Sequence, residues 1–396
     1  MNPGHPLVLT WLVIAGAAPL DAATLSEFAP LATRIGAQVS VPAERSNGAF
    51  FVNVMVNGRG PYRMFVDTGC ALTVVSQELA TAVGAVSAAP SGVAIDAKNG
   101  FGDSVDVRPV VLESLAIGGA TFEGVEACVS GAFDRISGID AKRVDGALGY
   151  NLFADLYLTL DIPKDRVVLS DRWPDGAPPV LAELAVAQRA GVPFVPVRIQ
   201  GKPLDVMIDT GSNEDLQLPS DLSQAMRWKE KPRPGALVAV FDETDRETIG
   251  RLGGSLNWGG VRQAEPTTSV SANGLPTIGM RFLVHFCVVF HEAEDRVWLC
   301  SADRAPVPSP AERSIGLSLV SASEGWRVAG VIPGSPAEKA SIRAGEVVTR
   351  IEGEPALSWT PDKLRHWIVS HDSVALVVAS GSGERNLTLR VWSLVP

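Results

Sequence analysis

The 396-residue sequence lacks the motifs that mark nucleotide and metal chemistry. It has no Walker-type phosphate loop, no G-x-G-x-x-G turn after a strand and no H-E-x-x-H pair. Its five histidines are dispersed and its four cysteines include no C-x-x-C pair, so neither a metal site nor a cofactor is expected. The formal net charge of −10 argues against a nucleic-acid partner, because binding a phosphate backbone needs a basic face.

Helical periodicity is also scarce, and residues 76–83 (SQELATAV) form one of few helix candidates. The 38 glycines and 28 prolines are scattered between many short Val-rich runs, which is typical of strands separated by turns. Apolar residues make up 46% of the chain, enough to fill sizeable cores. The sequence therefore predicts a mainly β protein of two or three domains.

The first 23 residues have little charge and no Lys or Arg. The apolar stretch Pro6–Leu20 is shorter than the about 20 residues that span a membrane comfortably. Small residues follow it, so residues 1–23 are predicted to be a signal peptide, with the mature protein periplasmic or extracellular. A buried segment or a weak anchor is the alternative. In that case the protein is cytoplasmic, or membrane-associated if the segment is retained.

Cys287 and Cys300 lie symmetrically about the centre of a predicted hairpin whose turn reads HEAED. They are expected to face each other across two antiparallel strands, within the range of a disulfide. Export would favour the bond, whereas two buried thiols fit the same positions equally well.

Two stretches with the same order of residues recur along the chain. Asp-Thr-Gly occurs at residues 67–69 and 209–211, an offset of 142 (209 − 67). The flanking matches are 50–58 with 193–201, 147–153 with 277–283, and 156–169 with 286–299, the last two at an offset of 130 (279 − 149). One order of elements found twice indicates a duplicated domain. We call residues 40–172 the first copy and residues 180–300 the second copy.

Each copy is expected to begin with a β-hairpin that turns at Asn57-Gly58 or at Gln200-Gly201. The second strand of each hairpin runs into Asp-Thr-Gly, and an apolar-Gly element and a closing hairpin follow further along. A linker rich in Pro and Gly, residues 173–179, joins the copies.

Each copy carries two apolar residues, Asp-Thr-Gly and a small residue, and an apolar-apolar-Gly element downstream. These segments are 65–70 with 147–149 in the first copy and 207–212 with 277–279 in the second. Each copy thereby resembles a lobe of the retropepsin-like aspartic proteases, and the pair resembles the bilobal pepsin-like enzymes. The resemblance implies two tandem acid-protease β-barrel lobes, an aspartic endopeptidase activity, and a polypeptide substrate in the cleft between the lobes.

The catalytic pair implied by this resemblance is Asp67 and Asp209. Two carboxylates about 3 Å apart cannot both ionise, so they share one proton. One then activates water as a base while the other acts as an acid. The residues expected to support the site are Thr68, Gly69, Cys70, Thr210, Gly211, Ser212, Gly149 and Gly279. The resemblance further places substrate-covering flaps around Gly100-Phe101-Gly102 and around Gly253-Gly254.

Two departures from the family pattern bear on activity. Cys70 stands where Ser, Thr or Ala is usual, and a thiol is a poorer donor, so Asp67 is expected to be less well supported than Asp209. Asn213-Glu214-Asp215 adds two acids, which either raise the pKa of the pair by repulsion or are exposed loop residues. The alternative function is therefore a catalytically weak or inactive protease-like scaffold that binds peptides.

Residues 301–313 form a Pro-rich linker, and residues 314–393 resemble a bacterial-type PDZ domain. The motifs that carry this resemblance are VIPGSPA at 331–337, IRAGEVV at 342–348 and IEG at 351–353.

The resemblance implies that the PDZ-like part binds a C-terminal peptide as an added strand. Ile315, Gly316 and Leu317 match the loop that receives the carboxylate, although Ser318 departs from the usual pattern. A helix is expected near Pro361, capped by Thr360. Association of two chains through this part is a further possibility.

Overall fold

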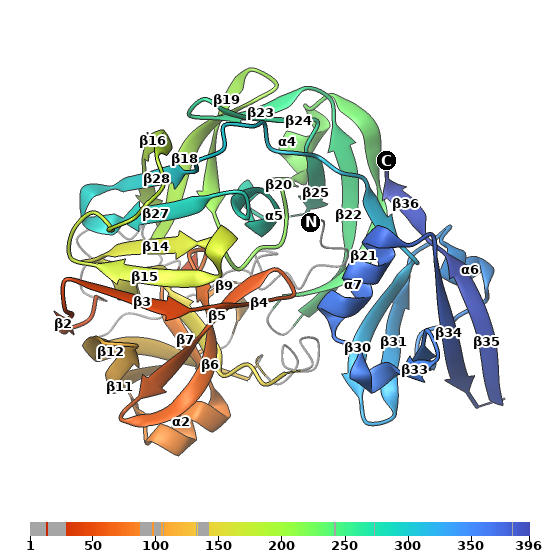
Figure 1. Cartoon of the computed structure of the whole chain (residues 1–396), viewed down its shortest axis with the longest axis horizontal. Helices are drawn as coiled ribbons and strands as arrows, with labels where there is room; N and C mark the ends of the chain where they lie inside the picture. Colours follow the sequence, from red (N-terminus) through yellow and green to blue (C-terminus); the bar gives the residue numbers. More distant parts are fainter. Residues whose placement is uncertain are drawn as a thin grey trace.

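A computed structural model describes residues 13–14, 29–87, 97–98, 104–105, 107–131, 133, 142–240, 243–272, 274–381 and 383–396. Figure 1 shows the first copy in red to yellow, the second in green to cyan, and the C-terminal domain, residues 314–396, in blue beside them. In this described part of the chain, no helix is long and apolar enough to cross a membrane. The predicted signal peptide lies outside the described residues, except for Val13–Ile14 (β1).

The described residues of the first copy form a nine-stranded sheet in the order β2-β12-β7-β13-β6-β5-β11-β8, with β4 beside β5. Its strands are β2 (Ala32–Arg34), β4 (Glu44–Ser46), β5 (Ala49–Val56), β6 (Arg59–Asp67), β7 (Thr73–Ser76), β8 (Val86–Ser87), β11 (Arg108–Ile117), β12 (Ala120–Ser130) and β13 (Gly146–Gly149). Two short strands, β9 (Ala97–Lys98) and β10 (Ser104–Val105), pair with each other, and β9 also pairs with β1.

The predicted helix of the first copy is α2 (Gln77–Val83). Ser76 caps its first turn by accepting a hydrogen bond from the Leu79 N–H at 3.0 Å. Gly84 ends it in the left-handed conformation, with φ of 65°. The short helix η1 (Tyr150–Phe153) follows β13 directly.

The described part of the second copy repeats this plan in a ten-stranded sheet, in the order β21-β22-β25-β20-β26-β19-β18-β23-β24, with β17 beside β18. Its strands are β17 (Ala187–Arg189), β18 (Val192–Ile199), β19 (Lys202–Ile208), β20 (Leu216–Pro219), β21 (Trp228–Val240), β22 (Glu243–Leu252), β23 (Ser255–Trp258), β24 (Val261–Ala264), β25 (Thr267–Ser271) and β26 (Thr277–Ile278). Its short helices are α4 (Ser220–Gln224) and α5 (Met280–Leu283).

Both leading hairpins turn where the sequence predicts. Asn57 and Gly58 have φ of 48° and 71°, and Gln200 and Gly201 have φ of 53° and 80°. Two consecutive positive φ values define the type I′ turn, whose twist matches that of the flanking strands. Each hairpin therefore delivers its second strand, β6 or β19, to an Asp-Thr-Gly loop.

The two copies are joined by a sheet of six described strands, in the order β16-β28-β27-β14-β15-β3. Its strands are β3 (Gln38–Pro42), β14 (Tyr157–Asp161), β15 (Arg166–Ser170), β16 (Val180–Ala185), β27 (Cys287–His291) and β28 (Arg296–Cys300), with the short turns η2 (Ile162–Lys164) and η3 (Glu292–Glu294) at the hairpin ends. At its centre β14 and β27 run antiparallel, with Thr159 opposite Val289. These two are repeat equivalents (159 + 130 = 289), so the copies are related here by an approximate twofold axis.

The expected opposition of two cysteines across the closing hairpin is confirmed. Cys287 and Cys300 are direct partners in the register of β27 and β28. Both are buried and carry free thiols in the structure. Burial raises the pKa of Cys287 to about 12 and that of Cys300 to about 11, so both remain protonated at neutral pH.

The C-terminal domain has its own core, which includes Trp326, Val348 and Ile368. Its described strands form a sheet in the order β30-β31-β32-β34-β35, with β33 beside β32, and a separate pair β29-β36. The elements are β29 (Glu312–Ser314), β30 (Leu317–Ala322), β31 (Gly325–Val331), β32 (Val347–Ile351), β33 (Glu354–Pro355), β34 (Ser373–Ser380), β35 (Gly383–Arg390), β36 (Trp392–Val395), α6 (Pro336–Lys339), η4 (Ala356–Ser358) and α7 (Pro361–Ser370).

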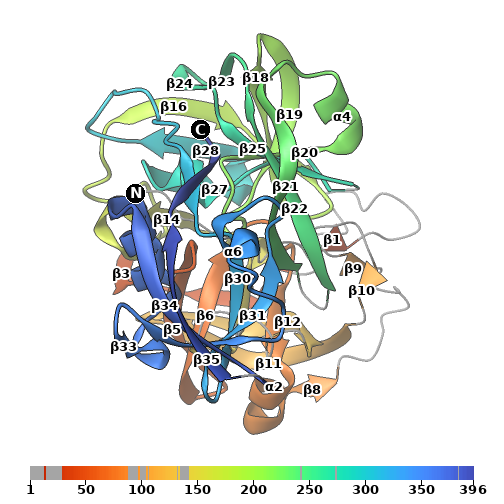
Figure 2. The ribbon, with the colours of Figure 1, turned by 90° about the vertical axis from the view of Figure 1, so that its right-hand side faces the viewer.

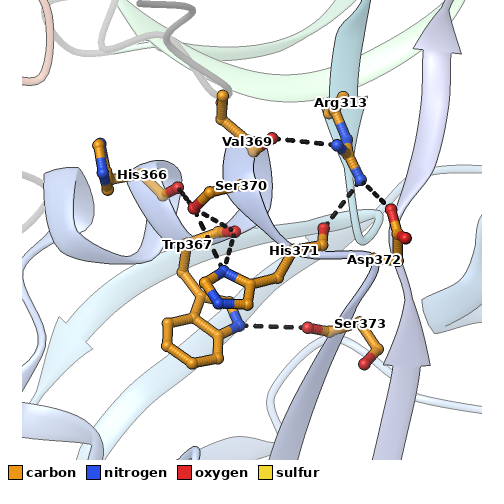
Figure 3. A network of polar contacts seen from close by, with 8 residues as sticks. All are labelled: Arg313, His366, Trp367, Val369, Ser370, His371, Asp372 and Ser373. Carbon is orange, nitrogen blue, oxygen red and sulfur yellow. Dashed lines mark hydrogen bonds and ion pairs between the residues drawn. The ribbon is translucent and has the colours of Figure 1, made fainter.

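Helix α7 is fixed at both ends. Thr360 is the predicted N-cap, and its Oγ accepts from the Lys363 N–H at 3.1 Å. At the other end the Arg313 guanidinium donates to the carbonyl oxygens of Val369 at 3.0 Å and His371 at 2.8 Å, and pairs with Asp372 (Figure 3). A cation suits a helix C-terminus, where the last carbonyl groups carry partial negative charge.

The C-terminal domain packs against the hairpin β21–β22 of the second copy, and both ribbon views place β30 and β31 beside it (Figures 1 and 2). Ala236 and Ile249 of the hairpin share a buried cluster with Ile332 and Leu394. The Leu237 N–H also donates to Ser318 Oγ at 2.8 Å. The predicted linker, residues 301–313, thus leads into a domain that packs against the second copy. The last two residues of the predicted linker belong to strand β29 of that domain.

Candidate active site

The two Asp-Thr-Gly loops are held together by reciprocal hydrogen bonds between their threonines. The Thr68 N–H donates to Thr210 Oγ at 3.0 Å, and the Thr210 N–H donates to Thr68 Oγ at 3.1 Å. Each hydroxyl in turn donates across the interface, Thr68 to the Ile208 carbonyl and Thr210 to the Val66 carbonyl, both at 2.8 Å. All four bonds are buried, so they fix the position of one loop against the other.

Asp67 and Asp209 meet at this junction, close enough for Asp209 to raise the pKa of Asp67. Only 1% of Asp67 and 0% of Asp209 is exposed. Burial raises the pKa of Asp67 well above its usual range, and the neighbouring charge of Asp209 raises it further. A proton shared between the two carboxyls removes one of the two buried charges.

Backbone amides support both carboxylates. The Gly69 N–H donates to Asp67 Oδ1 at 3.0 Å, and the Gly211 N–H donates to Asp209 Oδ1 at 2.8 Å. The Ser212 N–H adds a second bond to Asp209 Oδ1 at 3.1 Å. Gly69 also lies against the opposite carboxyl, since a Cβ on it would be 2.5 Å from Asp209 Cγ. The glycine is thus required by the close approach of the two loops.

The small residues that end the two motifs, Cys70 and Ser212, do not support the carboxylates through their side chains. Cys70 Sγ donates to the Leu72 carbonyl at 3.0 Å. The Ser212 hydroxyl has no hydrogen-bond partner among the described residues. The backbone N–H groups of Cys70 and Ser212 instead hydrogen-bond to the aspartate of their own copy. Asp67 is predicted to be less well supported than Asp209 because Cys70 follows it. The structure shows that no such difference arises from the side chains, because neither Cys70 nor Ser212 bonds an aspartate through its side chain.

The apolar-Gly elements pass beneath the Asp-Thr-Gly loops. Strand β13 lies between β6 and β7, with Gly149 opposite Asp67, and β26 lies between β19 and β20. A Cβ on Gly149 would be 2.2 Å from the Leu72 carbonyl carbon, and a Cβ on Gly279 would be 2.5 Å from the Ser212 carbonyl oxygen. Glycine is therefore needed where these strands pass under the loops.

The interpretation of the two extra acids as exposed loop residues is wrong. Glu214 is 1% exposed and Asp215 is 4% exposed. Burial raises the pKa of Asp215, and the charges of Arg281 and Arg251 oppose that shift. The sequence gives no sign of this compensation, because both arginines are distant along the chain.

The flap predictions have different outcomes. Gly100-Phe101-Gly102 lies outside the described residues. Gly253 and Gly254 lie at the base of the hairpin β21–β22, where the Gly253 N–H donates to the Arg227 carbonyl at 2.9 Å. They therefore cannot be the tip that covers a substrate. Pattern reasoning missed this long hairpin, because two prolines and Gly235 interrupt β21.

The loop of the C-terminal domain that is predicted to receive a peptide is mostly buried and hydrogen-bonds within its own domain. Ile315 and Leu317 are 1% and 2% exposed. Gly316 has φ of 91°, and its N–H donates to Ser314 Oγ at 2.9 Å. Within the described part of the chain β30 pairs only with β31, so its other edge can accept a strand. Leu237 lies near the start of this edge, through its bond to Ser318.

No group of three or more His, Cys, Asp or Glu side chains in the described part of the chain is arranged to hold a metal ion. The polar groups that converge at the loops are two carboxyls, backbone amides and two threonine hydroxyls. Such a set can exchange protons with a bound water and with a peptide group.

Family models match two parts of the chain. Residues 52–152 match the family described as Aspartyl protease, and residues 327–380 match the PDZ domain. The chain therefore contains an aspartyl-protease-like domain and a PDZ domain, which confirms the resemblances of the first copy and of the C-terminal domain. The protease match lies within the first copy, whereas the second copy is linked to it by the repeat and by the shared plan of its strands.

Two solved structures are similar to separate parts of the chain. One is a retropepsin-like aspartic protease from Rickettsia conorii, 20% identical, with 35% of this chain and 92% of that chain covered and a TM-score of 0.23. The other is the HtrA3 PDZ domain bound to a phage-derived ligand, 19% identical, with 21% and 88% covered and a TM-score of 0.19. No curated protein matches the chain.

Proposed function

We propose that this protein is an aspartic endopeptidase that cleaves a polypeptide held between the two copies. The observation that carries the proposal is the meeting of two buried carboxyls, Asp67 and Asp209, on loops locked by reciprocal threonine hydrogen bonds. Ordinary turns do not bury two acids against each other, because an unshared pair of charges is costly there.

In the proposed reaction the pair holds one proton between its two carboxyls. The ionised carboxyl removes a proton from a water molecule, which attacks the peptide carbonyl. The protonated carboxyl donates to the developing oxyanion, and the pair then returns a proton to the leaving amine. The N–H groups of Gly69 and Gly211 hold the carboxylates in place during this exchange.

The PDZ domain is proposed to bind an extended peptide along the open edge of β30, with a C-terminal carboxylate near Gly316. Such a peptide would come from the substrate or from a partner protein. Export is part of the proposal, supported by the apolar residues 6–20. It is tested by sequencing the N-terminus of the protein recovered outside the cytoplasm.

The decisive experiment digests a peptide library between pH 3 and pH 8 with the wild type and with Asp67→Asn and Asp209→Asn. Each variant is expected to lose cleavage while it keeps its circular dichroism spectrum and its unfolding transition. Full activity in either variant contradicts the mechanism. Wild-type protein that binds peptides and cleaves none at any pH would favour the scaffold function instead.

A further inference from the structure

A cavity of about 550 Å³ lies where helix α7 of the PDZ domain meets both copies. Cavities of this size commonly hold small ligands or parts of a peptide. Its polar lining comes from all three parts of the chain, with Arg45 in the first copy, Asn213, Arg281 and His285 in the second, and Arg365 and His366 on α7. No single part of the chain forms this cavity alone.

The charged groups that line the cavity are mainly cationic. Three arginines line it, and Asp362 is the one carboxylate among the described lining residues. Arg281 is held by Glu312 at 2.6 Å and Arg45 by Asp165, and neither of those carboxylates lines the cavity. Arg365 pairs with Asp362 within the lining at 3.0 Å. Each of the three guanidinium groups is thus held by a carboxylate, and the lining carries three arginines against one acid.

Asn213 shows that the cavity wall carries hydrogen-bonding groups suited to a ligand. It lies four residues after Asp209 and is 1% exposed. Neither atom of its side-chain amide has a hydrogen-bond partner among the described residues. A buried amide N–H₂ left in this way is unfavourable, so a ligand that offers it an acceptor gains by binding there.

The face of α7 that lines the cavity differs from the face that fills the domain core. Asp362, Arg365, His366 and Val369 line the cavity, whereas Ile368 is buried in the core. Figure 3 shows the His366 ring pointing away from the Trp367–His371 stack. The helix is therefore held in one rotation about its axis, and that rotation sets which charges reach the cavity.

We propose that this cavity is a specificity pocket for an acidic side chain of the polypeptide substrate, completed by residues of the PDZ domain. The inference rests on the proposed protease function and names a substrate class for it. A carboxylate fits because guanidinium groups and an amide N–H₂ are its preferred donors. Asn213, four residues after Asp209, lines the pocket, so the proposal places the acidic residue and the scissile bond on one bound segment.

The first test compares matched peptides that differ only by Glu or Gln at each position of a cleaved sequence. At one position the wild type is expected to prefer Glu by about tenfold in kcat/KM, the effect of one charge-assisted hydrogen bond. Arg45→Gln and His366→Gln should reduce that ratio toward one. Lys363→Gln, on the same helix but over the Trp359 ring, should leave the ratio unchanged.

A binding experiment tests this inference separately from the proposed catalytic function. Fluorescence anisotropy measures the binding of the same labelled peptides to Asp209→Asn protein, which needs no catalysis. Preference for Glu that disappears in Asp209→Asn/His366→Gln supports the pocket even if the wild type cleaves nothing. Equal affinity for Glu and Gln peptides at every position overturns the pocket, whether or not cleavage occurs.

Discussion

Replacing Thr210 by Val removes one hydroxyl and leaves the shape of the side chain almost unchanged. The change deletes the acceptor of the Thr68 N–H and the donor to the Val66 carbonyl, both in a fully buried place. Each partner left without a hydrogen bond costs about 1–3 kcal/mol, so the free energy of unfolding should fall by about 2–6 kcal/mol. Because the loops also lose their mutual alignment, kcat should fall about a hundredfold.

Urea unfolding followed by tryptophan fluorescence measures the stability, and the slope m should stay unchanged. The matched control is Thr210→Ser, which keeps both hydrogen bonds and loses one methyl group, worth about 1 kcal/mol. A Thr210→Val protein within about 0.5 kcal/mol of the wild type, with full activity, would refute the role given to the threonine pair.

Three further outcomes are expected. Gly69→Ala should abolish cleavage in a folded protein, because its Cβ would be 2.5 Å from Asp209 Cγ; peptide digestion measures it. The pKa of Asp67 is raised above its unfolded value, so its proton stabilises the fold at low pH. That contribution, and the activity, should be lost as pH rises through the folded pKa, as unfolding and kcat profiles against pH will show. Glu312→Gln should lower the free energy of unfolding by about 3–5 kcal/mol, because it breaks the buried ion pair between Glu312 and Arg281; urea unfolding and faster proteolysis of the linker measure it.

Local patterns predicted the elements that build the site. The turns at Asn57-Gly58 and Gln200-Gly201, the Thr360 cap, and the strands β13 and β26 each depend on a few neighbouring residues. The pairing of the two aspartates followed from the repeat, because a duplicated fold brings equivalent loops to a common axis.

The rest could not be predicted because it depends on contacts between distant segments. Asp215 is buried because Arg281 and Arg251 oppose its cost of desolvation, and neither lies near it in the sequence. The docking of the PDZ domain depends on the hairpin β21–β22, whose prolines weaken its strand pattern. Ser318 departs from the usual loop pattern, and in the fold it accepts a hydrogen bond from Leu237.

The cavity beside α7 exists only while the two copies and the PDZ domain stay assembled. Any molecule that fills it binds the assembled state and not the parts alone, so it must stabilise the assembly by mass action. At a concentration one hundred times its Kd the gain is about 2.7 kcal/mol. A rise in Tm is therefore a measure of occupancy that needs no cleavage, and screening carboxylate compounds in this way would search for ligands before any substrate is known.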